Sequence, residues 1–596
     1  MCFLTNPKHI KGLLLAAKDK RTTIKIHALM IKTNLSTYRN FMGRVIASYA
    51  SNYDIVSARK LFEELPQRGV DTFNAMIIAY SRKESPFEVL GLYNRMIKDG
   101  VKPDSSTFTV ALKACVGLMD MEMGEEIWRK AVDFGYENDV FVGSSMLNLY
   151  AKCGKMYEAT AVFDKMKRKD LVCWSSMING FAVNRQPCEA VEIYRRMQKE
   201  GIEGDEVVIV GLIQACANLG DSRLWLSVHG YAIKRDLDFD VKVQTSLVDM
   251  YAKNGHLDLA SHVFKKMSHK NVVSWGALIS GFAQNGLVGS TLETLVEMQS
   301  CGFEPDSVSL MSALLSCAQI GLLKLGKSIH GYILRRFDFD QVLGTAVIDM
   351  YSKCGAPSCA RAIFDQMESR DLISWNVIIA SYGIHGHGKE ALSLFLQMIE
   401  TKQMPDHSTF ASLLWALSHS GLVEEGQYWF DLMVSKYKIQ PSEKHYACMV
   451  DLLARAGRVE EALQLIDSMN TEPGLAVWVA LLSGCHNNGK LSVGEMVAKK
   501  VLELNPDDSG IHALVSNFFA MKEKWDEVAG VRKTMRNMRI KKVPGYSAVE
   551  VNGELHAFIM EDKSHHQFED ILNILKKLDR EMRAIRCLPN TELCMV

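Results

Sequence analysis

The feature that most constrains the fold is an internal period of about one hundred residues. Four kinds of residue return at this interval: Trp174, Trp275 and Trp375; Tyr150, Tyr251 and Tyr351; Cys115, Cys216 and Cys317; Asp205, Asp306 and Asp406. A fixed internal period is the sequence signature of a solenoid, in which each repeat packs mainly on its neighbours. Such a fold places equivalent residues side by side, so it can contact an extended ligand unit by unit.

The composition agrees with a repeat array. A single globular core of 596 residues would be unusually large, whereas a solenoid core grows in one dimension. No run approaches the roughly 18 apolar residues of a membrane helix, so we expect no membrane partner. The 14 cysteines form no CxxC pair, which favours a reducing compartment and buried thiols over a disulfide framework.

The charge distribution is uneven although 69 Lys and Arg balance 69 Asp and Glu. Residues 1–38 are basic and hold one acid, Asp19, so the rest of the array is slightly acidic. That is not the basic footprint of a typical nucleic-acid binder. The basic N-terminus resembles an organelle presequence, and it is equally compatible with the first helix of the array.

Each period divides into three helical hairpins of unequal length. In 272–306, the apolar residues Val273, Leu278, Ile279 and Phe282 are spaced for one face of a first helix. Asn285-Gly286 predicts the turn to a second helix, because glycine tolerates the left-handed backbone found at helix ends. No segment shows sustained strand alternation, so the pattern predicts an all-α fold of stacked helix pairs.

Recurrent phrases such as YAKCG at 150–154, ACANLG at 215–220 and GFEPD at 302–306 resemble a known family. They are similar to the plant pentatricopeptide repeat proteins whose repeats alternate between ordinary, long and short types (the PLS subclass). The resemblance covers nearly the whole chain and implies a right-handed superhelical solenoid of helix-turn-helix repeats.

The same resemblance implies a division of the chain. A basic N-terminus at 1–38, a possible presequence, overlaps a partial long repeat. The array occupies 39–474, E motifs occupy 475–542, and an E-plus motif occupies 543–596. The expected repeats are 39–69, 70–104, 105–139, 140–170, 171–205, 206–240, 241–271, 272–306, 307–340, 341–371, 372–406, 407–442 and 443–474.

In this family one repeat reads one RNA base, through the fifth residue of its first helix and its last residue. The resemblance therefore implies the following base-reading residues: Asn74 with Asp104, Ser144 with Asp170, Ser175 with Asp205, Thr245 with Asn271, Asp306 opposite Gly276, Thr345 with Asp371, and Asn376 with Asp406. By the family's code, Asn/Asp favours U, Ser/Asp and Thr/Asp favour G, and Thr/Asn favours A. The implied target, read 5′ to 3′, is U-x-G-G-x-A-x-x-G-U.

A simpler role competes for the aspartates. An Asp at the end of a repeat can cap the next helix, a contribution of about 1 kcal/mol. The Asn, Ser and Thr residues that accompany them at the fifth positions favour base readout, so both roles stay open. Because the repeat-terminal aspartates add to the acidity of the array, its charge is a weaker argument against RNA binding.

Other motifs predict no chemistry. Residues 321–328 match the P-loop pattern G-x4-G-K-S, but a phosphate loop needs a preceding strand and this interior reads as helix. His385 and His387 have no third ligand nearby, so we expect no metal site. The repeated Trp and Cys residues fit core packing.

We expect no enzymatic activity and no cofactor, and hence no catalytic residues. Many relatives continue into a cytidine-deaminase-like domain, which needs an H-x-E glutamate and a CxxC pair for zinc. This chain has neither, and it stops near where that domain would begin.

The leading hypothesis is a site-recognition factor for C-to-U editing of single-stranded organellar RNA, in the mitochondrion or alternatively the chloroplast. Residues 475–596 would recruit a deaminase-bearing pentatricopeptide repeat protein and multiple organellar editing factors. Their basic stretch is Arg532, Lys533, Arg536, Arg539, Lys541 and Lys542. The alternatives are an RNA stability, splicing or translation factor, and a protein-binding helical-repeat scaffold.

Overall fold

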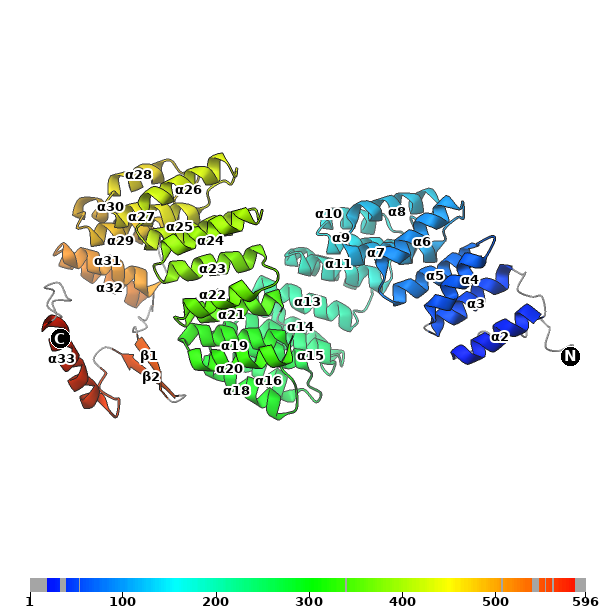
Figure 1. Cartoon of the computed structure of the whole chain (residues 1–596), viewed down its shortest axis with the longest axis horizontal. Helices are drawn as coiled ribbons and strands as arrows, with labels where there is room; N and C mark the ends of the chain where they lie inside the picture. The colour runs from blue at the N-terminus through cyan, green and yellow to red at the C-terminus, as the bar shows by residue number, and fades with distance from the viewer. Residues whose placement is uncertain are drawn as a thin grey trace. The chain divides into compact units, whose positions relative to one another are not determined.

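The computed structural model describes residues 19–32, 39–52, 54–337, 340–504, 508–538, 546–551, 554–559 and 562–584. Over this part of the chain the fold is a series of stacked helical hairpins (Figure 1). The prediction of an all-α repeat solenoid is confirmed. The chain divides into two compact units, Met1–Gly281 and Phe282–Val596, and the division falls within α17 (Val272–Gln284).

The first unit contains the helices from α2 onward, and each expected repeat interval from 39–69 to 241–271 holds one helix pair. The helices are α2 (Lys20–Lys32), α3 (Arg39–Ser51), α4 (Ile55–Glu64), α5 (Val70–Arg82), α6 (Pro86–Lys98), α7 (Ser105–Leu118), α8 (Met121–Asp133), α9 (Val140–Lys152), α10 (Met156–Lys165), α11 (Leu171–Val183), α12 (Pro187–Lys199), α13 (Glu206–Leu219), α14 (Ser222–Lys234), α15 (Val241–Lys253) and α16 (Leu257–Lys266).

The second unit continues the same pattern and ends in a different element. Its helices are α18 (Val288–Ser300), α19 (Ser307–Ile320), α20 (Leu323–Arg336), α21 (Gln341–Lys353), α22 (Pro357–Gln366), α23 (Leu372–Ile384), α24 (Gly388–Glu400), α25 (His407–His419), α26 (Val423–Ser435), α27 (Glu443–Arg455), α28 (Val459–Asp467), α29 (Leu475–Asn487), α30 (Leu491–Glu503), α31 (Ser509–Met521), α32 (Trp525–Asn537) and α33 (Phe568–Ala584).

The first helices of successive repeats pack on one another. In the first unit α7 contacts α9, α9 contacts α11, and α11 contacts α13; in the second unit α21, α23, α25, α27 and α29 form the same series. Each second helix packs on its own first helix and on the next one, as α12 does on α11 and α13. Each unit is therefore a two-layer stack in which equivalent first-helix residues recur along one layer.

The residues that repeat in the sequence form this stack. Trp174, Trp275 and Trp375 are 0%, 1% and 3% exposed, which confirms that they are core residues. Cys115, Cys216 and Cys317 are fully buried, as expected. The predicted turn at 285–286 is confirmed by Gly286, whose φ of 73° lies in the left-handed region.

One detail of the helix-face prediction is wrong. Val273 is 62% exposed, whereas Trp275, Leu278 and Ile279 are buried. The apolar periodicity alone placed Val273 on the buried face, but the two-layer packing turns the second residue of this helix to solvent.

A three-residue contact, which we call the aromatic junction, joins each short repeat to the next ordinary repeat. A Phe on the second helix of the short repeat packs edge-to-face against the fourth residue of the following first helix, and a Lys or Arg lies over the Phe ring. The four junctions are Phe62–Phe73–Arg68, Phe163–Trp174–Lys169, Phe264–Trp275–Lys270 and Phe364–Trp375–Arg370. Ring centroids lie 4.7 to 5.1 Å apart, within the range of favourable aromatic pairs.

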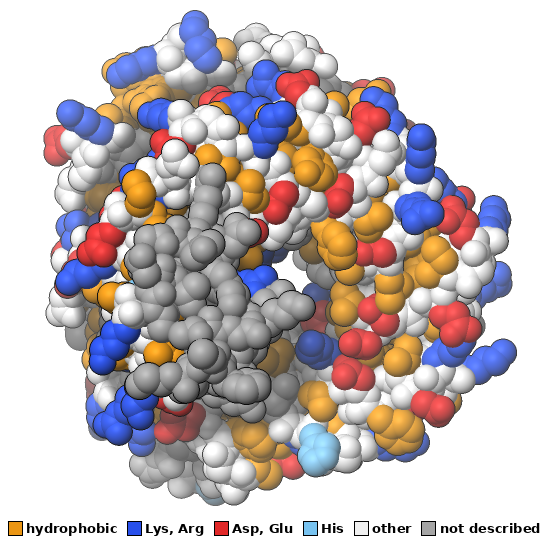
Figure 2. Space-filling model, turned by 90° about the vertical axis from the view of Figure 1, so that its right-hand side faces the viewer, with side chains coloured by type: hydrophobic (Ala, Val, Ile, Leu, Met, Phe, Trp, Pro, Cys, Tyr) orange, Lys and Arg blue, Asp and Glu red, His pale blue; other side chains and the backbone are white. Residues whose placement is uncertain are grey.

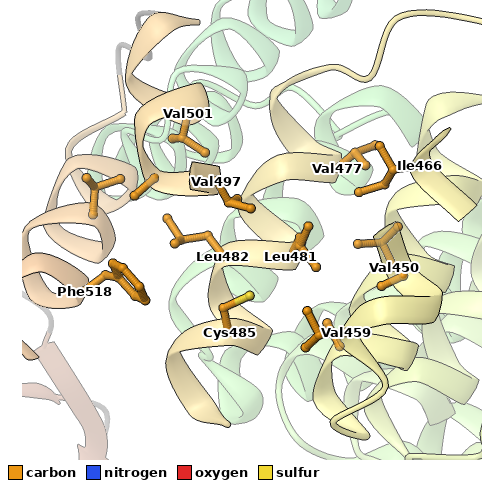
Figure 3. Packing of buried hydrophobic residues seen from close by; sticks show 14 of the residues in the cluster. Val450, Val459, Ile466, Val477, Leu481, Leu482, Cys485, Val497, Val501 and Phe518 are labelled. Carbon is orange, nitrogen blue, oxygen red and sulfur yellow. The ribbon is translucent and has the colours of Figure 1, made fainter. Parts of the chain in front are cut away.

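One hydrophobic core joins the last repeat to the residues beyond 474. Figure 3 shows side chains of α27 to α31 meeting in one cluster, in which Val450 and Leu481 face each other and Phe518 lies on the far side of Leu482. Because this cluster is continuous, α29 to α31 are an extension of the solenoid.

The C-terminal part contains an element that the sequence analysis missed. Strands β1 (Tyr546–Val551) and β2 (Glu554–Ile559) form an antiparallel hairpin in which Val549 is opposite His556. The sequence signal was present: Asn552-Gly553 separates two segments of alternating apolar residues, a pattern that strongly favours hairpins. The helical periodicity of the preceding residues obscured it.

Within the described residues, no helix combines the length and the apolar composition needed to cross a membrane.

A second recurrent contact links long and short repeats through two histidines, of which His229 is half-buried and His330 is buried. The Nδ1 atoms of His229 and His330 lie 2.9 and 3.1 Å from the hydroxyl oxygens of Tyr251 and Tyr351. Burial lowers the pKa of both histidines below the ordinary value of 6.5. The folded protein therefore favours the neutral imidazole at these positions.

We expect replacement of a junction tryptophan to destabilise the array. Trp375→Ala removes a buried ring and leaves a cavity beside Phe364, and such changes cost about 3 to 5 kcal/mol. Trp525→Ala is the control, because Trp525 is 64% exposed, and its cost should stay below about 0.5 kcal/mol. Urea denaturation followed by circular dichroism measures both. Equal midpoints for the two variants would contradict the junction's structural role.

His229 and His330 predict acid sensitivity. Since their folded-state pKa values are lowered, the unfolded chain binds more protons below about pH 6.5, and the stability present at neutral pH is lost as the pH falls through that range. The variant His330→Trp places at this site the residue found at the equivalent position of an earlier repeat, Trp128. Its midpoint of denaturation should change less between pH 7.5 and 5.5 than that of the wild type. An unchanged pH dependence would contradict this assignment.

Candidate functional site

The residues expected to read bases lie at equivalent points of the stack. Each fifth residue stands in the second turn of a first helix, and each last residue immediately precedes the next first helix. The fifth positions differ in exposure: Asn74 and Ser175 are buried, each 8% exposed, and Ser144, Thr245 and Thr345 are exposed to an intermediate degree. The two sets of side chains therefore border the same layer of first helices.

The last residues cap the following helices. Oδ1 of Asp170, Asp205, Asp306 and Asp371 accepts a hydrogen bond from the third amide of the next helix at 2.8 to 3.0 Å. Asn271 makes the same bond to the Ser274 amide at 2.8 Å. Helix capping, the simpler role considered for these residues, is thus present at all five of these positions. It satisfies amides that the start of a helix leaves unpaired.

Capping uses only one of the two carboxylate oxygens in some of these aspartates. In Asp205 and Asp371 the cap uses Oδ1, and the described residues provide no hydrogen-bond partner for Oδ2. A carboxylate has about four acceptor sites, so one oxygen can hold the helix while the other contacts a ligand. Capping and ligand binding are therefore compatible in one side chain.

In one repeat the expected pair is in direct contact. Asn74 Nδ2 donates to both carboxylate oxygens of Asp104, each at 2.9 Å, and the Thr107 hydroxyl donates to Asn74 Oδ1 at 2.6 Å. Asn376 Nδ2 approaches Asp406 Oδ1 more loosely, at 3.5 Å. Burial opposes ionisation of Asp406, but hydrogen bonds from Thr409 and Asn376 outweigh it and lower the pKa of that carboxyl.

The serine and threonine pairs are arranged differently. The hydroxyls of Ser144, Ser175, Thr245 and Thr345 each donate to a carbonyl of their own helix, at 2.7 to 3.1 Å. Within the described chain, none of them is hydrogen-bonded to the last residue of its repeat. Because the hydroxyl proton is used by the backbone, each oxygen can serve a ligand only as an acceptor.

Two of the long repeats, which end at Asp139 and Asp240, close with a different geometry, whereas Asp340, which ends the next long repeat, has ψ of 170° and accepts from one amide. Asp139 and Asp240 have ψ of 123° and 129°, and their Oδ1 atoms accept from two amides each. The aspartates that end ordinary and short repeats have ψ near 180° and accept from one amide, as Asp205 does (ψ −175°). Sequence reasoning treated all these aspartates alike, and no residue pattern in the segment distinguishes the two backbone conformations.

The P-loop match and the histidine of the candidate metal pair both have structural explanations. The P-loop match lies at the end of α19 and the start of α20, so a helix precedes it where a strand would be needed. His385 Nε2 donates to the Ser352 carbonyl at 2.9 Å, which bridges neighbouring first helices. Asn184 and Asn488 make the equivalent bridges to Ala151 and Ala454.

The surface has mixed charge. Figure 2 shows one face, on which Lys and Arg side chains are interspersed with Asp and Glu. Arg532, Lys533 and Arg536 of the basic stretch are exposed on α32, and the other three members lie outside the described residues. The face in Figure 2 therefore offers no patch of a single charge sign to a ligand. The distinctive feature of the array is instead the ordered series of polar pairs at the fifth and last positions.

Comparison with family models identifies the repeats. The pentatricopeptide repeat model matches residues 144–171, 172–202, 245–272, 273–303, 345–372, 408–437 and 445–472, and a related repeat-family model matches 68–117 and 370–419. The E motif model matches residues 486–550.

Full-length comparisons agree. A putative mitochondrial pentatricopeptide repeat-containing protein of Arabidopsis thaliana is 56% identical over 97% of this chain and 96% of its own length. A chloroplastic one from the same plant is 35% identical over 97% of this chain and 71% of its own. Among solved structures, the pentatricopeptide repeat protein PPR10 in complex with an 18-nt RNA element aligns with a TM-score of 0.48 at 14% identity, covering 89% of this chain and 92% of that one.

The capping role predicts how these aspartates tolerate change. Asp205→Ala removes the cap of α13 and should lower the free energy of unfolding by about 1 kcal/mol. Asp205→Asn should leave stability nearly unchanged, because asparagine caps helices as well as aspartate does. Denaturation of the two variants side by side measures the difference, and equal losses would contradict the capping role.

Proposed function

This chain belongs to the pentatricopeptide repeat family, and we propose that it is a sequence-specific single-stranded RNA-binding protein of a plant organelle. Within that role, we propose that it marks sites of C-to-U editing. The observation that carries the proposal is the series of polar pairs at the fifth and last positions, which recurs in the first-helix layer of each unit while the aromatic frame stays constant.

The chemistry of the pairs supports distinct base preferences. Guanine presents two N–H donors on its Watson–Crick edge, and the Ser175 oxygen together with Asp205 Oδ2 offers two acceptors. Adenine presents a donor and an acceptor, which suits an amide such as Asn271. The Asn74–Asp104 pair is assigned to uracil by the family's code, which gives the target U-x-G-G-x-A-x-x-G-U for residues 70–406.

The aspartates proposed to contact bases also account for the acidic charge of the array. Their carboxylates meet base donors, while lysines and arginines elsewhere on the surface meet phosphates. Phosphate contacts release counterions, so we expect the affinity to fall with rising salt. A near-neutral protein can bind RNA specifically in this way, because the sequence information lies in hydrogen bonds to base edges.

The C-terminal part supports the editing role over RNA stabilisation, splicing or translation. Residues 486–550 match the E motif, and by resemblance the E and E-plus segments recruit a deaminase-bearing partner and other organellar editing factors. The mitochondrial name of the Arabidopsis relative supports assignment to that organelle, with the chloroplast as the alternative. The deaminase chemistry is proposed to come from the partner.

An isosteric exchange tests the base assignment. Asp205→Asn keeps the helix cap and replaces an acceptor by an amide, so the fourth base of the target should change from G to A. We expect the variant to bind a ten-nucleotide RNA with A at that position about tenfold more tightly than the G form, and the wild type to show the reverse order. Fluorescence anisotropy at fixed salt measures both affinities.

Asp240→Asn is the matched control. It changes the cap of α15 in the same way, but its repeat carries Val210 at the fifth position, which cannot hydrogen-bond a base. Its base preferences should stay those of the wild type.

If wild-type protein bound scrambled RNA as tightly as the target, the base-reading assignment would be wrong.

A further inference from the structure

The aromatic junction is incomplete at the end of the array. At the fifth junction, between α28 and α29, Trp478 again occupies the fourth position of the first helix. Ile466 stands where the other junctions have Phe, and Pro473 stands where they have Lys or Arg. Trp478 is consequently left partly exposed, with its Nε1 donating to the Pro473 carbonyl at 3.1 Å.

A pocket of about 570 Å³ lies beside this tryptophan. Its walls include Trp478 from α29 and Met496, Lys499 and Lys500 from α30. Met496 is 53% exposed, so the pocket has an apolar wall that faces solvent. It is large enough for an aromatic side chain and its neighbours.

The complete junctions show what this space accommodates. Lys500 follows Trp478 by the same interval at which Arg196 follows Trp174. Arg196 lies 5.7 Å from the centre of the Phe163 ring, and that ring packs against Trp174 with centroids 4.8 Å apart. The space between Trp478 and Lys500 therefore corresponds to the place of a phenylalanine ring between a tryptophan and a cation.

The charge around the pocket is positive on balance. Glu495, in its wall, is bonded to Lys522 and Lys524, and the side-chain hydrogen bond from Lys522 is the main reason that its pKa is lowered to about 2. Lys499 lies 3.4 Å from the same carboxylate, and Lys500 contacts Glu503 at 3.1 Å. The lining itself holds two lysines and two carboxylates, and Lys522 and Lys524, which bond Glu495 from outside the lining, make the surroundings positive, which favours an acidic ligand.

We propose that this pocket binds an aromatic side chain flanked by acidic residues, presented by a partner protein. The ring would pack on Trp478 and under Lys500, completing the junction from outside, and the flanking carboxylates would pair with the lysines. The inference deepens the proposed recruiting role of the residues after 474 and rests on that role only for the biological identity of the partner.

A synthetic peptide tests the site directly. The probe is a fluorescein-labelled pentapeptide with a central Phe between two Asp on each side, and its binding to the full chain is followed by anisotropy. Replacing the central Phe by Ala should weaken binding by about tenfold, the difference that loss of an aromatic contact of about 1.4 kcal/mol produces. Replacing the flanking Asp by Lys should abolish binding. Absence of binding by the Phe peptide would overturn the proposal.

Rebuilding the junction provides the decisive variant. The double change Ile466→Phe with Pro473→Lys restores beside Trp478 the residue types of the complete junctions, so it should weaken peptide binding at least tenfold while retaining the fold. Lys499→Glu with Lys500→Glu leaves the core untouched and should weaken the Phe peptide similarly. Unchanged peptide affinity in either variant would overturn the assignment of the pocket.

RNA binding distinguishes this inference from the proposed function. Both double variants should bind the ten-nucleotide target as the wild type does, because none of these residues is a proposed base reader. If the double change Ile466→Phe with Pro473→Lys weakened RNA binding instead, the pocket would be a nucleotide site and the protein-partner inference would be wrong. Failure of the wild type to prefer its target RNA would count against the proposed function alone.

Discussion

The hydrogen bond between a repeat-ending Asp or Asn and the start of the next helix is the constraint on which most of the array depends. It fixes where those first helices begin, as Asp205 does for α13 and Asp371 for α23. The same bond orients the side chain proposed to read a base. Because one carboxylate oxygen satisfies the helix and the other stays available, a structural requirement and a recognition role coexist in one residue. This coupling limits the usable residues to those that cap well, chiefly Asp and Asn.

The aromatic junctions give this arrangement its regular spacing. Each buries a large ring between two repeats and shields it with a cation, so neighbouring helix pairs keep the same relation from one repeat to the next. Where two of the three residues differ, at Ile466 and Pro473, the junction tryptophan Trp478 is partly exposed and borders a surface pocket. In a regular solenoid, a repeat whose junction residues differ from the others exposes groups that the other repeats bury. Such a difference is therefore informative.

Much of the fold could be predicted from the sequence, because packing in a solenoid is local and the same contacts recur in each repeat. The burial of Trp275 and Cys216 followed from their recurrence alone. The exposure of Val273 could not be predicted, since apolar periodicity does not reveal how two layers share a helix surface. The β-hairpin at 546–559 was predictable from its Asn-Gly signal but lies in a segment without the repeat frame.

The sequence by itself determined the helix pairs, their order and the family, and it left capping and base readout as two open roles for the repeat-ending residues. Only the tertiary structure decided how the paired positions meet: Asn74 bonds Asp104 directly, whereas Ser175 turns its proton to its own helix. It also showed that Asp240 caps with a different backbone angle from Asp205, and that Trp478 borders a pocket. The physical reason is that recurrence specifies which residues are equivalent, but side-chain hydrogen bonds and packing depend on neighbours that lie about thirty residues away along the chain.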